Sequence, residues 1–161
     1  FISWHPSGLI DPMLMHASLP GKLSMIAKHT LFKVPILGRF IRGAGAVPIE
    51  RSQDTSDQQG SKNRNKQQLD NVASVVANGG RLIIFPEGTR SLYGTQAILK
   101  RGVFKILETV KTRSHIVNHT AGKYWNNSFL IRPGIIDINI VPLEYDTNLE
   151  NLKNKIQNHF S

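Results

Sequence analysis

The chain contains no cysteine. Disulfide bonds, a thiolate nucleophile and cysteine-ligated zinc are therefore excluded, so any nucleophile must be an oxygen or a nitrogen. Acidic residues are also few, because 11 Asp and Glu stand against 20 Lys and Arg and leave a formal net charge of +9 at pH 7. A surplus of this sign favours an anionic partner such as a phosphate ester, an anionic membrane surface or nucleic acid.

Long apolar runs are absent as well. No stretch approaches the roughly 18 to 20 apolar residues that a membrane-spanning helix requires, and the first residues do not form a signal peptide. Because the first residue is Phe1 and not Met, we expect that an N-terminal segment precedes this chain. With 161 residues, of which 40% are hydrophobic, the chain is long enough for a core, and we expect residues 1–161 to form one domain.

Short β-branched apolar runs alternate with helical patterns along the chain. This alternation predicts an α/β fold, in which a largely parallel central sheet is flanked by helices. The candidate strands share this apolar, β-branched character and cover residues 1–4, 22–27, 46–49, 81–85, 115–118 and 135–141.

Three helices are predicted by helically spaced apolar residues, beginning at Leu69, Val103 and Leu149. The first two have apolar residues at i, i+3, i+4 and i+7, and the third has Leu149, Leu152, Ile156 and Phe160. The first is expected to end at Asn78-Gly79-Gly80, a typical left-handed C-terminal cap. For the third, Thr147 and Glu150 predict a capping box. The polar stretch from Ser52 to Gln68 is expected to be an exposed loop.

The opening stretch SWHPSGLIDP places His5 and Asp11 six positions apart. Six residues turn about 600° on a helix and span roughly 20 Å on a strand, so neither element brings the two side chains together. Only a folded-back loop does, and Pro6 and Gly8 favour such a reversal. If the loop closes, the carboxylate can orient the imidazole and stabilise its protonated form.

Two other interpretations of this stretch stay open. Asp11 followed by Pro12 is also a typical helix start, in which the carboxylate accepts backbone N–H bonds and Pro occupies the first helical position. A metal site made of His5, Asp11 and His16 is conceivable, although the spacing matches no compact metal motif.

The stretch RLIIFPEGTRS, residues 81–91, is the most distinctive in the chain. An apolar strand ends at Pro86 and is followed by polar residues. These residues are at the carboxyl end of the strand, where open α/β sheets bind ligands. Gly88 lets a ligand approach the backbone, and the Arg90 guanidinium can bind a phosphate through two parallel hydrogen bonds. A plain turn with a solvated arginine is the alternative.

Other strands end in the same way. GAGAVPIERS contains a short strand that ends near Arg51, and Lys28 follows the strand of residues 22–27. Because carboxyl ends of parallel strands meet at one edge of a sheet, the polar residues that follow the strands are expected together there. This set consists of His5, Lys28, Arg51, Glu87 and Arg90.

With these residues placed, the chain resembles the glycerolipid acyltransferase family, which includes the glycerol-3-phosphate and 1-acylglycerol-3-phosphate acyltransferases. The family's first block is a His and an Asp, to which His5 and Asp11 correspond. Its second is a Gly-containing strand that ends in Arg, as in Gly45 to Arg51. Its third, Phe-Pro-Glu-Gly-Thr-Arg-Ser, stands whole at residues 85–91, and the basic sequence that commonly follows stands at Lys100 to Gly102.

The resemblance implies direct transfer of an acyl group from acyl-CoA or an acyl carrier protein to the hydroxyl of glycerol-3-phosphate or its monoacylated product. His5 would act as general base, a role that typically contributes about 10² to 10⁴ in rate, and Asp11 would orient and support it. No metal or redox cofactor is required. Arg51 and Arg90 would bind the acceptor's phosphate. The residues expected to shape that pocket or assist there are Glu87, Gly88 and Lys28.

The chain departs from the family pattern in two places. Five residues separate His5 from Asp11, where the family usually has four. Ile116-Val117-Asn118-His119 stands where the family usually has an apolar strand, and no substrate role is assigned to it.

The stretch LFKVPILGRFIRG, residues 31–43, mixes apolar and basic side chains. A segment of this kind can lie in a membrane interface, with apolar groups in the acyl chains and cations among the lipid phosphates. A core helix interrupted by Pro35, with solvated basic residues, is the alternative. We expect peripheral association with an anionic membrane, and the contact residues proposed are Phe32, Ile36, Leu37, Arg39 and Phe40.

The leading hypothesis is thus an acyltransferase of phospholipid biosynthesis. The alternative from another class is a catalytically inert module of the same fold that binds anionic lipid. Nucleic-acid binding is not expected, because the basic residues are not interleaved with stacking aromatic side chains and no nucleic-acid motif is present.

Overall fold

The structure is a computed structural model that describes residues 1–7, 10–50, 57–89, 98–110, 113–125 and 131–160. Its contacts divide the chain into two compact units. Unit 1 contains residues 1–19 and 84–161, and unit 2 contains residues 20–83. The expectation of a single domain over residues 1–161 stays a prediction, and each unit is described separately below.

Unit 1 contains a three-stranded sheet in the order β1-β5-β6, with bounds Ile2–Ser3, Ser114–His119 and Ile138–Leu143. β1 and β5 are parallel, and β5 and β6 are antiparallel. On its other side, β1 forms a parallel bridge with Ile84. The Ile84 carbonyl accepts from Ser3 N–H, and the Ile84 N–H donates to the Phe1 carbonyl. The residues that follow β1 and Ile84 are therefore held at neighbouring strand ends.

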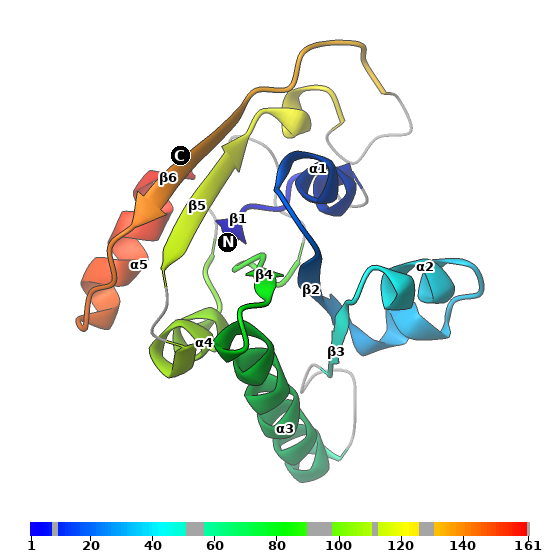
Figure 1. The fold of residues 1–161 in the computed structure, drawn as a ribbon, viewed down its shortest axis with the longest axis vertical. Helices are drawn as coiled ribbons and strands as arrows, with labels where there is room; N and C mark the ends of the chain where they lie inside the picture. Colours follow the sequence, from blue (N-terminus) through cyan, green and yellow to red (C-terminus); the bar gives the residue numbers. More distant parts are fainter. Residues whose placement is uncertain (8–9, 51–56, 90–97, 111–112, 126–130, 161) are drawn as a thin grey trace. The chain divides into compact units, whose positions relative to one another are not determined.

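The helices of unit 1 bury apolar side chains around this sheet (Figure 1). α5 lies along the β5–β6 pair and buries Leu152 and Ile156, and the ring of Phe160 beyond it stacks on Trp4 with 6.3 Å between centroids. The helical segments that the structure describes in unit 1 are α1 (Ile10–Ser18), α4 (Arg101–Val110), the short 3-10 helix η3 (Ala121–Lys123) and α5 (Leu149–Asn158).

Unit 2 contains a second three-stranded sheet in the order β3-β2-β4, in which both described pairings are parallel. α3 packs against β3 and β4, and the 3-10 helix η1 with α2 forms a compact pair at the end of β2 (Figure 1). The elements of unit 2 are β2 (Leu23–Lys28), η1 (His29–Lys33), α2 (Leu37–Gly43), β3 (Val47–Ile49), α3 (Gln58–Ala77) and β4 (Arg81–Ile83).

These elements confirm the predicted α/β class with mostly parallel strands, and the predicted C-terminal cap of α3 is present. Gly79 has a φ of +81° and its N–H donates to the Val76 carbonyl, as a left-handed cap requires. Each predicted strand is found, with one or both of its bounds shifted by up to three residues, because strand ends depend on pairing partners that the local pattern does not contain.

Two local predictions are wrong. The expected loop of residues 52–68 is helical from Gln58 onward, because Asp57 accepts a hydrogen bond from Gly60 N–H and so begins a helix that the polar sequence conceals. The cap of α5 is Asn148 and not Thr147. Its side chain accepts hydrogen bonds from the N–H groups of Glu150 and Asn151.

Candidate active site

His5 and Asp11 are in direct contact in unit 1. His5 follows β1, Asp11 is the second residue of α1, and Pro6 and Ser7 form a bend after His5. The distance from His5 Nδ1 to Asp11 Oδ2 is 2.9 Å. Five intervening residues therefore permit the contact, although Gly8 lies outside the described residues.

Asp11 does not act as the helix cap that its sequence context suggested. The helix begins at Ile10, and Asp11 Oδ2 accepts from the Ser7 N–H at 2.7 Å as well as from His5. Both contacts therefore use the same carboxylate oxygen, on the side of the loop and away from the first turn. The Asp11 side chain is fully buried, so these donors compensate the cost of removing a carboxylate from water.

The His5 ring is fixed in orientation and in tautomer. It stacks on Phe85 with ring centroids 4.4 Å apart and an interplanar angle of 26°. Since a carboxylate oxygen only accepts, neutral His5 carries its proton on Nδ1, and Nε2 keeps the lone pair that can accept a proton from a substrate. The side chain is 19% exposed, so the ring is reachable although its partner is not.

Glu87 supports the backbone of His5. It lies in the turn that follows Ile84, where Gly88 N–H donates to the Phe85 carbonyl at 3.1 Å and Gly88 has a φ of +63°, a conformation that glycine adopts without strain. Glu87 is 1% exposed, and its Oε1 accepts the His5 N–H at 3.0 Å. The predicted part of Glu87 and Gly88 in a phosphate pocket stays a prediction.

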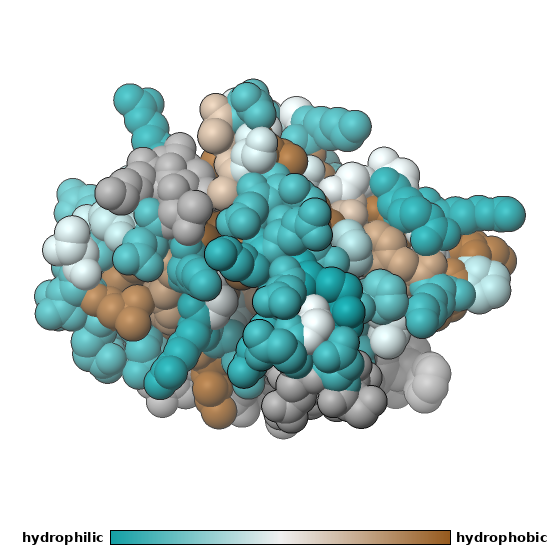
Figure 2. Space-filling model, turned by 90° about the horizontal axis from the view of Figure 1, so that it is seen from below, coloured by the Kyte–Doolittle hydropathy of each residue, from teal (hydrophilic) through white to brown (hydrophobic). Residues whose placement is uncertain are grey.

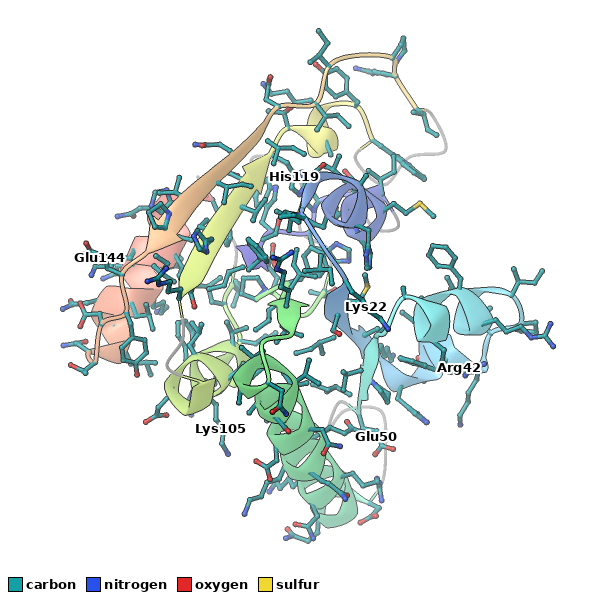
Figure 3. The ribbon with its side chains drawn as sticks, in the orientation of Figure 1. Lys22, Arg42, Glu50, Lys105, His119 and Glu144 are labelled. Atoms are coloured by element: carbon teal, nitrogen blue, oxygen red, sulfur yellow. The ribbon has the colours of Figure 1, made fainter. Side chains whose placement is uncertain are left out.

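His119 is a residue of this site that the sequence did not reveal. It is the last residue of β5, it is 4% exposed, and Figure 3 shows it on the side of β5 that faces α1. Its Nε2 lies 3.3 Å from the Trp4 carbonyl oxygen and 3.8 Å from Asp11 Oδ1. Burial lowers the pKa of His119, against the opposing effects of the Asp11 carboxylate and the Trp4 carbonyl. The sequence offered only the presence of His119 where the family usually has an apolar strand, because His115 and Asn118 in the same strand are also polar.

The predicted phosphate ligands belong to different parts of the chain. Lys28 is the last residue of β2 in unit 2, whereas Arg51 and Arg90 lie outside the described residues. The backbone just before Arg51 is held by α3, because the Asn65 side chain accepts from Glu50 N–H at 3.0 Å and donates to the Glu50 carbonyl. The residue before Arg51 is therefore held in position by α3.

The predicted membrane segment folds as η1 and α2, joined through Pro35 and Ile36. Arg42 donates to the Phe32 carbonyl at 2.9 Å and so ties α2 back to η1. Ile36 is 83% exposed and lies at the centre of a classic γ-turn, with a φ of +63° and a 2.6 Å hydrogen bond from Leu37 N–H to the Pro35 carbonyl.

The five predicted contact residues of this segment differ in exposure. Ile36, Arg39 and Phe40 are exposed, whereas Phe32 and Leu37 are half-buried. Figure 2 shows apolar groups beside projecting hydrophilic ones at its right edge, where η1 and α2 lie. The exposed part of this surface is therefore a small apolar group between basic side chains.

Within the described residues, no group of three or more His, Asp or Glu side chains could hold a metal ion. No helix among those residues is long and apolar enough to cross a membrane.

The sequence matches the family model described as Acyltransferase over residues 1–145. Among curated proteins, it is 30% identical over 106 residues to the chloroplastic 1-acyl-sn-glycerol-3-phosphate acyltransferase BAT2 of Brassica napus, a match that covers 66% of this chain and 28% of that protein. It is 29% identical over 121 residues to a 1-acyl-sn-glycerol-3-phosphate acyltransferase of Pseudomonas aeruginosa, covering 74% of this chain and 44% of the relative. The chain thus spans less than half the length of these relatives.

Among solved structures, the fold is similar to the crystal structure of the 1-acyl-sn-glycerophosphate (LPA) acyltransferase PlsC from Thermotoga maritima. The TM-score is 0.70 at 21% sequence identity, and the match covers 99% of this chain and 61% of that one. The likeness extends over the whole α/β fold described above.

Proposed function

Because the chain belongs to the acyltransferase family, we propose that it transfers a fatty acyl group from a thioester donor to a hydroxyl of glycerol-3-phosphate or 1-acylglycerol-3-phosphate. The observation that carries this proposal is the 2.9 Å contact between His5 Nδ1 and the buried Asp11 carboxylate, while the His5 ring itself is partly exposed. The names of the matched relatives support the choice of a glycerophosphate acceptor.

The proposed reaction is one proton transfer coupled to one acyl transfer. His5 Nε2 takes the proton from the acceptor hydroxyl as its oxygen attacks the thioester carbonyl carbon. The new C–O bond forms, the C–S bond breaks, and the imidazolium returns the proton to the departing thiolate of CoA or the acyl carrier protein. Asp11 stabilises the transient positive charge through Nδ1–H, and Glu87 holds the backbone from which the ring extends.

Substrate binding is proposed from the sequence blocks. Arg51 and Arg90 bind the acceptor's phosphate, Lys28 adds a further positive charge, and Glu87 and Gly88 shape the turn that leads to Arg90. A guanidinium group can donate two parallel hydrogen bonds to phosphate oxygens. Because both candidate acceptors carry a phosphate, the same arginines would bind either of them.

Membrane attachment is proposed for η1 and α2. Ile36 and Phe40 would enter the acyl-chain region while Arg39 meets lipid phosphates, with Phe32 and Leu37 packed behind them. Support comes from Ile36, which is both 83% exposed and held in a conformation that is strained for a β-branched side chain.

The test of the proposed reaction uses His5→Asn, in which the amide keeps an N–H donor where Nδ1 stands but removes the base at Nε2. We expect acyl transfer to fall by about 10² to 10⁴, measured as thiol release from acyl-CoA of several chain lengths with each acceptor in turn. His115→Asn, on the same sheet, is the matched control and should retain activity.

An inert lipid-binding module would behave differently. It would release no free CoA with either acceptor, and its binding to anionic vesicles would be the same in His5→Asn as in the parent protein. Acyl transfer that survives in a folded His5→Asn protein would contradict the role of His5.

A further inference from the structure

The two oxygens of the Asp11 carboxylate have different surroundings. Oδ2 accepts from His5 Nδ1 and from the Ser7 N–H, at 2.9 and 2.7 Å. Oδ1 has no hydrogen-bond partner within 3.5 Å among the described residues, and the polar atom that faces it is His119 Nε2, at 3.8 Å. A buried carboxylate oxygen in this position needs an N–H or O–H donor facing it, because burial without compensation is costly.

The position of His119 follows from the pairing of β1 with β5. Ile2 is opposite Ile116 and Ser3 is opposite Val117 in this parallel pair. Continuing the same register by two residues places His119 level with His5, 114 positions away in the sequence. The end of β5 therefore brings a second histidine to the Asp11 carboxylate from the side opposite the loop.

The contacts of His119 define its tautomer. The Trp4 carbonyl, 3.3 Å from Nε2, can only accept, so the proton of the neutral ring is on Nε2. Nδ1 is buried and has no hydrogen-bond partner among the described residues. A second proton there would be a buried donor without an acceptor, so the contacts favour the neutral ring.

We propose that His119 is a positioning residue for the His5–Asp11 pair. Its Nε2–H holds the Trp4 carbonyl, and with it the backbone that leads directly into His5. The same N–H faces Asp11 Oδ1 and keeps the carboxylate turned so that Oδ2 meets His5 Nδ1. This inference rests on the proposed role of His5 as general base.

His119 itself does not reach substrate, because its side chain is fully buried. The titratable groups that act on it are Asp11 from α1 and His5 beyond β1. Burial lowers the pKa of His119, against the Asp11 carboxylate and the Trp4 carbonyl, and positive charge on His5 lowers it further. A neutral N–H donor holds the Asp11 carboxylate in position and leaves its negative charge to stabilise protonated His5.

The test compares three variants. His119→Gln places an amide N–H near the position of Nε2–H, His119→Leu removes the donor at similar volume, and His115→Leu is the control on the same strand. We expect His119→Leu to lower kcat by about tenfold to a hundredfold with the KM for both substrates unchanged. His119→Gln should recover most of that loss, and His115→Leu should have the parent's kcat.

The pH dependence separates positioning from a merely structural role. Without the donor at Oδ1, the Asp11 carboxylate can turn away from His5 Nδ1, so it stabilises protonated His5 less well. The acidic limb of the kcat/KM profile should therefore move to lower pH in His119→Leu and return toward the parent value in His119→Gln. The His5 ring resonances, followed by NMR, should move in the same direction in His119→Leu.

Two results would overturn the inference. One is a His119→Leu protein that folds and keeps the parent's kcat and acidic limb. The other is an equal loss in His119→Gln and His119→Leu with no shift of the limb or of the His5 titration. The NMR titration needs no turnover, so it tests His119 even if His5→Asn shows that the proposed reaction is wrong.

Discussion

Buried polar side chains distinguish unit 1 from unit 2. Every polar or charged residue that is buried among those the structure describes belongs to unit 1, and Asp11, Glu87 and His119 are each less than 5% exposed. In unit 2 the described ion pairs of Arg64, with Glu50 and Asp57, involve partly or largely exposed side chains. Burying ionisable groups costs several kcal/mol unless they are paired, whereas exposed pairs contribute about 0 to 1 kcal/mol.

In the proposed reaction the two units would have different roles. Unit 1 holds ionisable groups in fixed positions around His5, as catalysis by proton transfer requires. Unit 2 presents strand ends and a basic, apolar surface, which suit binding. We therefore expect changes at the buried polar residues of unit 1 to lower kcat, and changes in unit 2 to alter KM or attachment to membranes.

The largest effect is expected for Asp11→Asn in unit 1. The amide carries no charge to stabilise protonated His5, and its NH2 group would donate to Nδ1 and so move the His5 proton to Nε2, where the base is needed. We expect kcat to fall by about 10³-fold or more in a steady-state acyl-transfer assay. A folded Asp11→Asn protein with a kcat within tenfold of the parent would contradict the proposed pair.

In unit 2, Asn65→Ala should alter binding and leave the chemical step intact. It removes both side-chain hydrogen bonds to the backbone of Glu50, which precedes Arg51. Losing these two hydrogen bonds should cost about 1 to 2 kcal/mol of the free energy that positions this segment. The KM for the phosphorylated acceptor should therefore rise by up to about tenfold, with kcat unchanged. Asn63→Ala, at an exposed position of the same helix, is the control. A fall in kcat alone would break the distinction between the units.

Acidification should weaken folding through His119. Since burial lowers the pKa of this imidazole below its ordinary value of 6.5, the unfolded chain takes up the proton at higher pH than the folded chain does. The contribution is complete above about pH 6.5 and is lost as the pH falls from there through the folded value, with a slope of at most about 1.4 kcal/mol per pH unit.

Urea unfolding of the parent and of His119→Gln at a series of pH values measures this contribution. The difference in slope between the two proteins below pH 6.5 isolates His119 from the other histidines. Identical slopes would show that His119 takes up its proton equally readily in both states.

The smallest effect is expected for Ile36→Gly in unit 2. Glycine relieves the strain of the γ-turn at φ +63°, so the free energy of unfolding should rise by about 1 kcal/mol. It also removes an exposed apolar side chain, so sedimentation with vesicles of phosphatidylglycerol and phosphatidylcholine at low salt should weaken by up to about tenfold. Ile135→Gly, at a residue of unit 1 that is 79% exposed, is the control. Equal vesicle binding by the parent and Ile36→Gly would remove Ile36 from the proposed membrane contact.

Local patterns predicted most elements of the fold. Apolar spacing placed α4 and α5, β-branched runs placed the strands, and Gly79 marked the end of α3. The predictions failed where a polar side chain decided the structure, as at Asp57, which begins α3 eleven residues before the first residue of its apolar pattern. Asn148 in place of Thr147 is a similar case, since both residues can cap a helix and only the backbone conformation selects one.

The acyltransferase family of this chain could be predicted from local sequence, because the His-Asp motif and the Phe-Pro-Glu-Gly-Thr-Arg-Ser block are short and consist of specific residue types. The contacts of the Asp11 carboxylate, in contrast, depend on tertiary structure. His5 and Ser7 meet one oxygen through a loop closure, and His119 meets the other through the parallel pairing of β1 with β5. Strand pairing brings together residues more than a hundred positions apart, and the periodicity of a single stretch of chain does not predict such a contact.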